Sequence, residues 1–189
     1  MKKDFLAKLN EMPIVASVKD EEGLNNALDS ECGVVFIIYG DICSIGRIVS
    51  KVKESGKIAI VHIDFIEGLA SREIAVRYIK ENTSADGIIS TKPGLIKAAK
   101  GMDLIAIQRY FLIDSISLNN FKKQIEHEYV DAVEILPGVM PKIIKKIVSS
   151  CHAPIIIGGF ISDKEDVMVG LQSGAIAVSS TKKDIWFLL

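Results

Sequence analysis

Eight short runs of apolar, largely β-branched residues recur along the whole chain, and segments with helical periodicity separate them. Their length and β-branched content predict strands, whereas apolar residues three and four apart, as at Leu118, Phe121 and Ile125, predict helices between them. Strands that alternate with helices pair in parallel, because parallel neighbours need a crossover connection. The runs span residues 13–18, 33–38, 57–63, 86–90, 103–108, 131–136, 154–158 and 174–179.

These eight units predict an α/β fold in which residues 1–189 form a single domain, a compact (β/α)8 barrel of the TIM type. The chain is shorter than the about 250 residues typical of this barrel, so some helices must be short. The fourth unit, from Thr91 to Lys100, is the weakest, because Pro93-Gly94 takes up part of its helix. An open sheet of seven or eight strands is the alternative. Residues 1–12 are expected to form a helix that closes the bottom of the barrel.

Charge and cysteine content exclude several other classes of protein. The chain has 23 Lys and Arg against 24 Asp and Glu, so no global positive field indicates nucleic acid or an acidic membrane. Its three cysteines include no C-x-x-C pair, which argues against a disulfide framework and a structural zinc site. There is neither a signal-peptide core nor an apolar run long enough to span a bilayer. We expect a cytoplasmic protein with no membrane partner.

Small residues end the last two runs, where Gly158-Gly159 and Ser179-Ser180 follow apolar strands. A capping box of Ser162 and Glu165 predicts that a helix starts soon after the glycines. The loops after the seventh and eighth strands of such barrels often bind phosphate, because glycine permits close backbone approach and a helix N-terminus attracts the anion. We therefore predict a phosphorylated small molecule at Gly158, Gly159, Ser179 and Ser180. The alternative is that the glycines only form a tight turn.

Two cations at predicted strand ends, Lys92 and Arg109, are the candidates for holding an anionic ligand. Lysine offers a point charge, whereas the planar guanidinium of arginine matches a phosphate or carboxylate group. The alternative is that either side chain is an exposed cation that pairs with a neighbouring carboxylate.

Acidic residues and one histidine also gather at the predicted strand ends. His62 and Asp64 are two residues apart on one strand, so their side chains are expected on the same face, where they could share a proton or a metal. With Asp41, Glu67 and Glu134 they could accept hydrogen bonds from ligand hydroxyls or hold a divalent cation. The alternative is a packed His62 that donates to Asp64, with the other carboxylates in solvent. No metal is firmly predicted.

Several segments covering nearly the whole chain in order carry a further signal: residues 13–20, 61–69, 86–92, 108–115 and 134–142, Gly158-Gly159, Ala177-Val178-Ser179-Ser180-Thr181 and Trp186. In these segments the sequence resembles a known family, the glycerol uptake operon antiterminators. The resemblance implies a barrel-like bacterial regulator that senses glycerol 3-phosphate and acts on the leader of a messenger RNA, letting transcription pass a terminator. Asp41, Asp64 or Glu134 would then accept hydrogen bonds from the glycerol hydroxyls, and the effector would be the only small molecule required.

Binding to RNA is implied by the resemblance alone, because the balanced charge gives no independent sign of it. The segment with Lys142, Lys145 and Lys146 could offer one basic strip to RNA, and the alternative is a solvated helix surface. A homodimer is compatible with the sequence.

Two enzymatic alternatives remain beside a regulator without catalytic activity. The first is a metal-dependent enzyme of the phosphodiesterase type that acts on glycerol phosphates and uses the acidic residues and His62 as ligands. Against it, Ser17-Val18-Lys19-Asp20 stands where such phosphodiesterases have a His-Arg-Gly sequence. The second is an isomerase or lyase of sugar phosphates, which the same phosphate-binding loops would serve.

Overall fold

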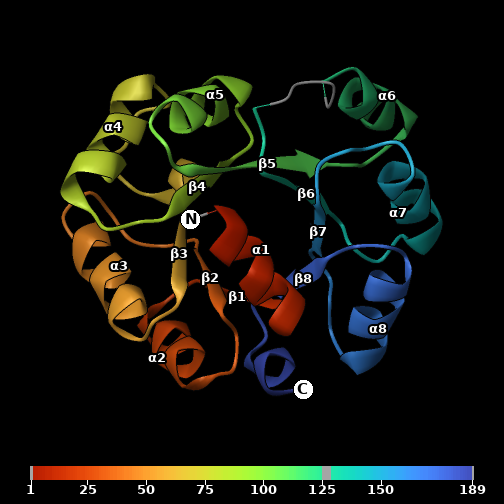
Figure 1. Ribbon diagram of the computed structural model, residues 1–189, viewed down its shortest axis with the longest axis horizontal. Coiled ribbons are helices and arrows are strands. Elements are labelled where there is room, and N and C mark those ends of the chain that lie inside the picture. Colours follow the sequence, from red (N-terminus) through yellow and green to blue (C-terminus); the bar gives the residue numbers. More distant parts are fainter. Residues whose placement is uncertain (1, 125–128, 189) are drawn as a thin grey trace.

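A computed structural model describes residues 2–124 and 129–188, and in it eight strands close into one barrel (Figure 1). Each strand pairs in parallel with the next along the chain, and β8 (Ala177–Ser180) returns to pair with β1 (Ile14–Val18). This closed order confirms the predicted (β/α)8 barrel over the open sheet. Ile125, which the periodicity assigns to a helix, lies outside the described residues. The strands in between are β2 (Val34–Ile37), β3 (Ile58–His62), β4 (Gly87–Ser90), β5 (Ile105–Phe111), β6 (Ala132–Leu136) and β7 (Ile155–Gly158).

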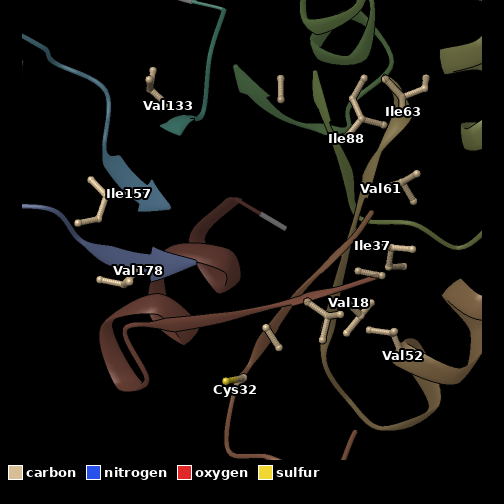
Figure 2. Packing of buried hydrophobic residues seen from close by; sticks show 14 of the residues in the cluster. Val18, Cys32, Ile37, Val52, Val61, Ile63, Ile88, Val133, Ile157 and Val178 are labelled. Atoms are coloured by element: carbon tan, nitrogen blue, oxygen red, sulfur yellow. The ribbon is translucent and has the colours of Figure 1, made fainter. Parts of the chain in front are cut away.

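A ring of helices surrounds the strands and covers their outer face (Figure 1). Figure 2 shows part of the apolar cluster between the two layers, where Val61, Ile88 and Ile157 point away from the barrel axis. The next residue in each strand, such as Ile60 or Ile89, belongs to a second cluster inside the barrel. The helices are α2 (Glu21–Asp29), α3 (Ile45–Glu54), α4 (Glu73–Asn82), α5 (Pro93–Gly101), α6 (Ser115–Gln124), α7 (Pro141–Val148) and α8 (Lys164–Gln172).

The helix α1 (Lys2–Glu11) closes the barrel at the amino ends of the strands, as the sequence predicts (Figure 1). Its Phe5 and Leu9 are fully buried and belong to the interior cluster, together with strand residues such as Val34 and Ile58. Burial of each such side chain contributes about 1.5 to 3 kcal/mol. This end of the barrel is therefore closed by apolar packing.

Two aspartates at the amino ends of strands, the buried Asp131 and the partly buried Asp86, form similar clamps. Asp131 accepts hydrogen bonds from the Lys100 ammonium at 2.7 Å and from the backbone N–H of Ala106 at 3.1 Å. Asp86 accepts them from Lys53 at 2.6 Å and from the N–H of Ala59 at 2.8 Å. Each clamp joins a helix, a strand and the start of the next strand, so we assign both to stability of the fold.

Two local features differ from the sequence prediction, and one further element follows the last strand. The fourth unit is not shortened, because Pro93 occupies the first turn of α5, where its missing N–H costs nothing. The strand β5 continues to Phe111, beyond the predicted end at residue 108, because its pairing with β6 continues to Leu136. After β8 the chain forms a short 3-10 helix, η2 (Lys183–Phe187). Within the described ranges, no helix is both long and apolar enough to cross a membrane.

Candidate functional site

A polar layer caps the apolar interior at the carboxyl ends of the strands. Side chains two residues apart in a strand point to the same face, so each residue two positions beyond an interior apolar residue also points inward. At these positions the chain changes from apolar residues to polar or very small ones. The change occurs at Ser17 after Val15, His62 after Ile60, Arg109 after Ile107, Glu134 after Ala132, Gly158 after Ile156 and Ser179 after Ala177.

An ion pair between Arg109 and Glu134 lies at the centre of this layer. The two residues face each other in the register of β5 and β6, and the Arg109 Nε to Glu134 Oε2 distance is 2.5 Å. The other carboxylate oxygen, Oε1, accepts a hydrogen bond from the Ser179 hydroxyl at 2.6 Å. Both charged side chains are buried, at 8% and 0% exposure. Both oxygens of Glu134 are thus already engaged by protein groups.

A cavity of about 150 Å³ opens beside this ion pair. It is smaller than the about 300 to 1,000 Å³ of pockets that take drug-sized ligands, so it suits a small metabolite. Arg109 is its cation, and within the described residues the two terminal guanidinium nitrogens make no hydrogen bond. The cavity is lined by Ser17, Ile38, Arg109, Glu134, Leu136, Gly159, Phe160, Ile161, Ser179, Ser180 and Thr181.

Backbone amides without acceptors line one side of the cavity. Across the part of the chain that the structure describes, no protein group accepts a hydrogen bond from the N–H of Gly159, Phe160, Ile161 or Thr181. Gly159 is partly buried and Ile161 is buried, and such backbone donors are normally paired, so their unpaired N–H groups favour an external acceptor. Phe160 and Thr181 are exposed and add two donors at the rim. Anionic oxygens are the strongest acceptors for such groups. This side of the cavity is therefore suited to a phosphate.

The two predicted glycines have different roles in this arrangement. Gly159 lines the cavity and has a φ of 77°, in the left-handed region that favours glycine. Gly158 points into the barrel, where a Cβ atom would collide with the Ser179 hydroxyl and approach Glu134. Gly158 therefore makes room for the hydrogen bond between Ser179 and Glu134, and it does not line the cavity.

The helix α8 begins one residue later than the sequence predicts. Asp163, not Ser162, is the N-cap, and its carboxylate accepts a hydrogen bond from the N–H of Asp166 at 2.9 Å. Asp166 in turn accepts from the N–H and the hydroxyl of Ser162, both at 2.7 Å. Because these carboxylates already occupy the first turn of α8, the open amides of the loops are the better place for an anion.

His62 is buried in the same polar layer without a hydrogen-bond partner. It is 1% exposed, its ring centre lies 4.4 Å from that of Phe65, and neither ring nitrogen is hydrogen-bonded within the described chain. Burial, followed by the positive charge of Arg109, lowers the pKa of His62 to about 3. The ring is therefore neutral at physiological pH.

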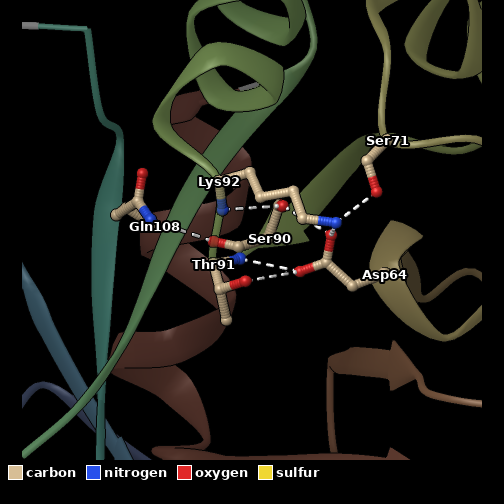
Figure 3. Close-up of polar contacts among 6 residues, drawn as sticks. All are labelled: Asp64, Ser71, Ser90, Thr91, Lys92 and Gln108. Carbon is tan, nitrogen blue, oxygen red and sulfur yellow. Dashed lines mark hydrogen bonds and ion pairs between the residues drawn. The ribbon is translucent and has the colours of Figure 1, made fainter.

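The expected pairing of His62 with Asp64 is absent, because β3 ends at His62 and Asp64 lies in a 3-10 turn, η1 (Ile63–Phe65). Asp64 instead accepts hydrogen bonds from the Ser90 hydroxyl at 2.9 Å and the N–H of Thr91 at 2.8 Å (Figure 3). Burial alone would raise the pKa of Asp64, but these hydrogen bonds hold it below its ordinary value.

Lys92 belongs to the Asp64 cluster and does not line the cavity. Figure 3 shows its side chain extending over Ser90, where its ammonium group contacts the Ser71 hydroxyl and lies 3.8 Å from Asp64. Of the two predicted cations, the structure brings only Arg109 to the cavity.

The remaining acidic candidates serve local structure. Asp41 accepts hydrogen bonds from the N–H groups of Cys43 and Ser44, which lower its pKa. Glu67 pairs with the segment around Asp41 through backbone hydrogen bonds. Over residues 2–124 and 129–188, no three His, Cys, Asp or Glu side chains lie together as a metal site requires. The predicted acidic cluster is thus divided among separate contacts.

Sequence reasoning missed several residues that line the cavity. Ser17 and Thr181 follow the alternation and the small-residue pattern, so those signals could have found them. Phe160 and Ile161 have apolar side chains, so no polar residue type in the sequence marks them; what they can offer a ligand is the backbone N–H. The predicted RNA candidates Lys142, Lys145 and Lys146 are exposed on α7, away from the cavity lining; whether they contact RNA stays a prediction.

Comparison with known proteins relates the chain to one family. A family model described as glycerol-3-phosphate responsive antiterminator matches residues 14–186. The uncharacterized protein YgcP of Escherichia coli (strain K12) is 41% identical over 184 residues, which are 97% of this chain and 96% of that protein.

Two solved structures are similar to this chain in both sequence and fold. The glycerol uptake operon antiterminator regulatory protein from Listeria monocytogenes has a TM-score of 0.88 and 30% identity, over 93% of this chain and 95% of that chain. An antiterminator-related protein of the glycerol uptake operon from Thermotoga maritima has a TM-score of 0.81 and 31% identity, over 92% and 96% of the respective chains.

Proposed function

Because this chain belongs to the glycerol-3-phosphate responsive antiterminator family, we propose that its cavity binds glycerol 3-phosphate and that the bound effector controls binding to a leader RNA. The observation that carries the proposal is the set of unpaired amides facing a small cavity beside Arg109. Amides and a guanidinium together match the oxygens of a phosphate group.

For the glycerol part of the effector we propose partners other than those expected from the sequence. Asp41, Asp64 and Glu134 were expected to accept hydrogen bonds from its hydroxyls, but all three are engaged by protein groups. The hydroxyls of Ser17 and Thr181 line the cavity, and neither is hydrogen-bonded to another residue that the structure describes. We assign the contacts with the glycerol hydroxyls to these two side chains.

Effector binding is tested by thermal unfolding with glycerol 3-phosphate, glycerol and inorganic phosphate compared side by side. A ligand of the folded state at about 100 times its Kd adds about 2.7 kcal/mol of stability. We expect the full effect for glycerol 3-phosphate alone. Equal shifts with all three compounds, or none with the phosphate ester, would contradict the proposal.

The variant R109K tests the role of the guanidinium. A lysine keeps the charge beside Glu134 but loses the planar donor pair, so we expect the Kd for glycerol 3-phosphate to rise about tenfold. Isothermal titration calorimetry measures this change. The control is R77K, the same replacement at an exposed arginine on α4, which should bind as the wild type does.

Control of RNA binding is tested with a transcript of the leader that precedes the source organism's glycerol uptake genes. An effector changes RNA affinity only if it binds one conformation better than another, and such couplings are typically about 1 to 3 kcal/mol. We expect RNA affinity to differ between the effector-free and saturated protein. Equal affinity under both conditions would refute regulation by this ligand.

We also propose that the chain acts by binding and not by turnover. The described carboxylates do not assemble a metal cluster that could activate water for phosphodiester hydrolysis. Incubation with a glycerophosphodiester and Mg²⁺ or Ca²⁺ is therefore expected to release no product, and measurable hydrolysis would restore the enzymatic alternative.

A further inference from the structure

Three large apolar side chains are exposed at the carboxyl end of the barrel, close to the effector cavity. Phe111 ends β5 at 52% exposure, Ile113 follows it at 85%, and Phe160 follows β7 at 81%. Together with Met140 they line a groove of about 570 Å³. Exposed apolar patches of this kind on a folded protein mark interaction sites.

The groove shares a wall with the effector cavity. Leu136, Gly159 and Phe160 line both hollows, so one loop separates the predicted phosphate site from the apolar surface. Phe160 has a φ of 61°, a left-handed conformation that residues with side chains rarely adopt. A ring held there and facing solvent is best explained by a partner that contacts it.

The helices beside the groove carry an unbalanced positive charge. Leu118 of α6 and Ile143 of α7 line a smaller hollow that shares Leu112, Ile113 and Met140 with the groove, so the two helices flank it. Figure 1 shows α6 and α7 next to each other outside β5 and β6. Their described sequences contain no Asp or Glu, although Asp114 directly precedes α6 and lines the smaller hollow. Lys142 lies in the first turn of α7, near the groove. The other lysines, Lys122, Lys123, Lys145 and Lys146, lie in the last turns, so the basic strip leads from the groove along the outside of the barrel.

Among the described residues these lysines have no paired carboxylate; Glu126 and Glu128, which follow α6 in the sequence, lie outside those residues. None of them forms an ion pair with a carboxylate in the part of the chain that the structure describes. The whole chain has a net charge of −1, so this basic sector is local. A partner that fits both features must combine flat apolar faces with a regular negative charge.

We propose that the groove holds unstacked bases of a single-stranded RNA segment while its phosphates follow the lysines of α6 and α7. Bases stack on exposed aromatic side chains, and lysines neutralise the backbone. The inference rests on the proposed function and adds to it the RNA surface and its link to the effector. Glycerol 3-phosphate would reach this surface through the loop of Gly159 and Phe160, which both hollows share.

The stacking part is tested by fluorescence anisotropy with the fluorescein-labelled leader transcript. F111A removes a ring outside the effector cavity, and we expect it to weaken RNA binding about tenfold. The control is F187A, because Phe187 on η2 is also 52% exposed. Glycerol 3-phosphate should still raise the melting temperature of F111A, which shows that the variant is folded and binds effector.

The electrostatic part is tested by the salt dependence of the same binding. The affinity of single-stranded nucleic acid falls with a log–log slope of about −0.7 per neutralised phosphate. The triple variant K142Q, K145Q, K146Q should therefore reduce the slope by about 2. The triple variant K3Q, K80Q, K97Q removes equal charge from exposed lysines on α1, α4 and α5 and should keep the wild-type slope.

The outcomes separate this inference from the proposed function. The wild type could bind RNA in an effector-dependent way while F111A and the α7 triple variant bind it as tightly as the wild type does. The proposed RNA surface is then wrong, and the proposed function stands. If the wild type binds no RNA, both are wrong. If sedimentation shows that F111A dissociates a dimer while RNA affinity is unchanged, the groove joins two copies of the chain and the inference is overturned.

Discussion

At the amino ends of the strands, Asp86 and Asp131 are each held by a lysine and a backbone N–H, and α1 closes the barrel over them. At the carboxyl ends, Arg109 and Glu134 form a buried ion pair beside an open cavity, and His62 is buried without any hydrogen bond within the described residues. The polar groups at the amino end satisfy one another, whereas at the carboxyl end the terminal nitrogens of Arg109 and both ring nitrogens of His62 have no hydrogen-bond partner among the described residues. The difference separates stability from function along one axis, as is general for this fold.

The largest expected effect is the loss of Glu134. E134A leaves the Arg109 guanidinium buried without its carboxylate, and breaking a buried pair in this way costs about 3 to 5 kcal/mol. Urea unfolding measures the loss. Because the phosphate of glycerol 3-phosphate can neutralise the unpaired guanidinium, we expect the effector to restore part of the stability.

E134Q serves as a milder variant if E134A does not fold, since the amide keeps the shape and can still accept one hydrogen bond. In either variant, the stabilisation by effector should exceed that of the wild type. An equal or smaller stabilisation would show that the phosphate does not bind near Arg109.

The matched change at the amino end is D131A. The carboxylate of Asp131 is 2% exposed, but its partners Lys100 and Lys2 are 41% and 51% exposed, so they regain hydration when it is removed. We expect a loss of about 2 kcal/mol in urea unfolding, mainly from the unpaired N–H of Ala106. Glycerol 3-phosphate should stabilise D131A only as much as the wild type. If glycerol 3-phosphate stabilised D131A more than the wild type, the contrast between the two ends of the barrel would be wrong.

His62 makes stability depend on pH. The unfolded chain binds a proton on this ring near pH 6.5, whereas the folded chain binds it only near pH 3. The His62 contribution is therefore complete above pH 6.5 and is lost as pH falls through this window, by about 2 kcal/mol at pH 5. We expect H62Q to lose that much less stability than the wild type between pH 7 and pH 5.

Chemical unfolding at the two pH values checks this expectation. H152Q makes the same change at an exposed histidine and should keep the acid dependence of the wild type. If H62Q and the wild type lose equal stability, His62 is not buried as a neutral ring.

Most of the architecture could be predicted from local patterns, and the site only in part. The alternation in β3, β5 and β6 places His62, Arg109 and Glu134 at inward positions because the period of a strand is fixed at two residues. The same rule failed for Asp64, because β3 ends before it. The length of the helix that begins at Pro93 was underestimated, since the prediction did not place proline in the first helical turn.

The sequence by itself determined the order of strands and helices and, within each strand, the alternation of inward positions and the change from apolar to polar side chains, because these properties depend on neighbours a few residues apart. Only the tertiary structure decided that Ser179 would meet Glu134 and that the amides of Gly159 and Thr181 would line one cavity. Those contacts depend on the closure of the barrel and on loop dihedral angles. Both are set by packing between segments far apart in the chain, which no local pattern records.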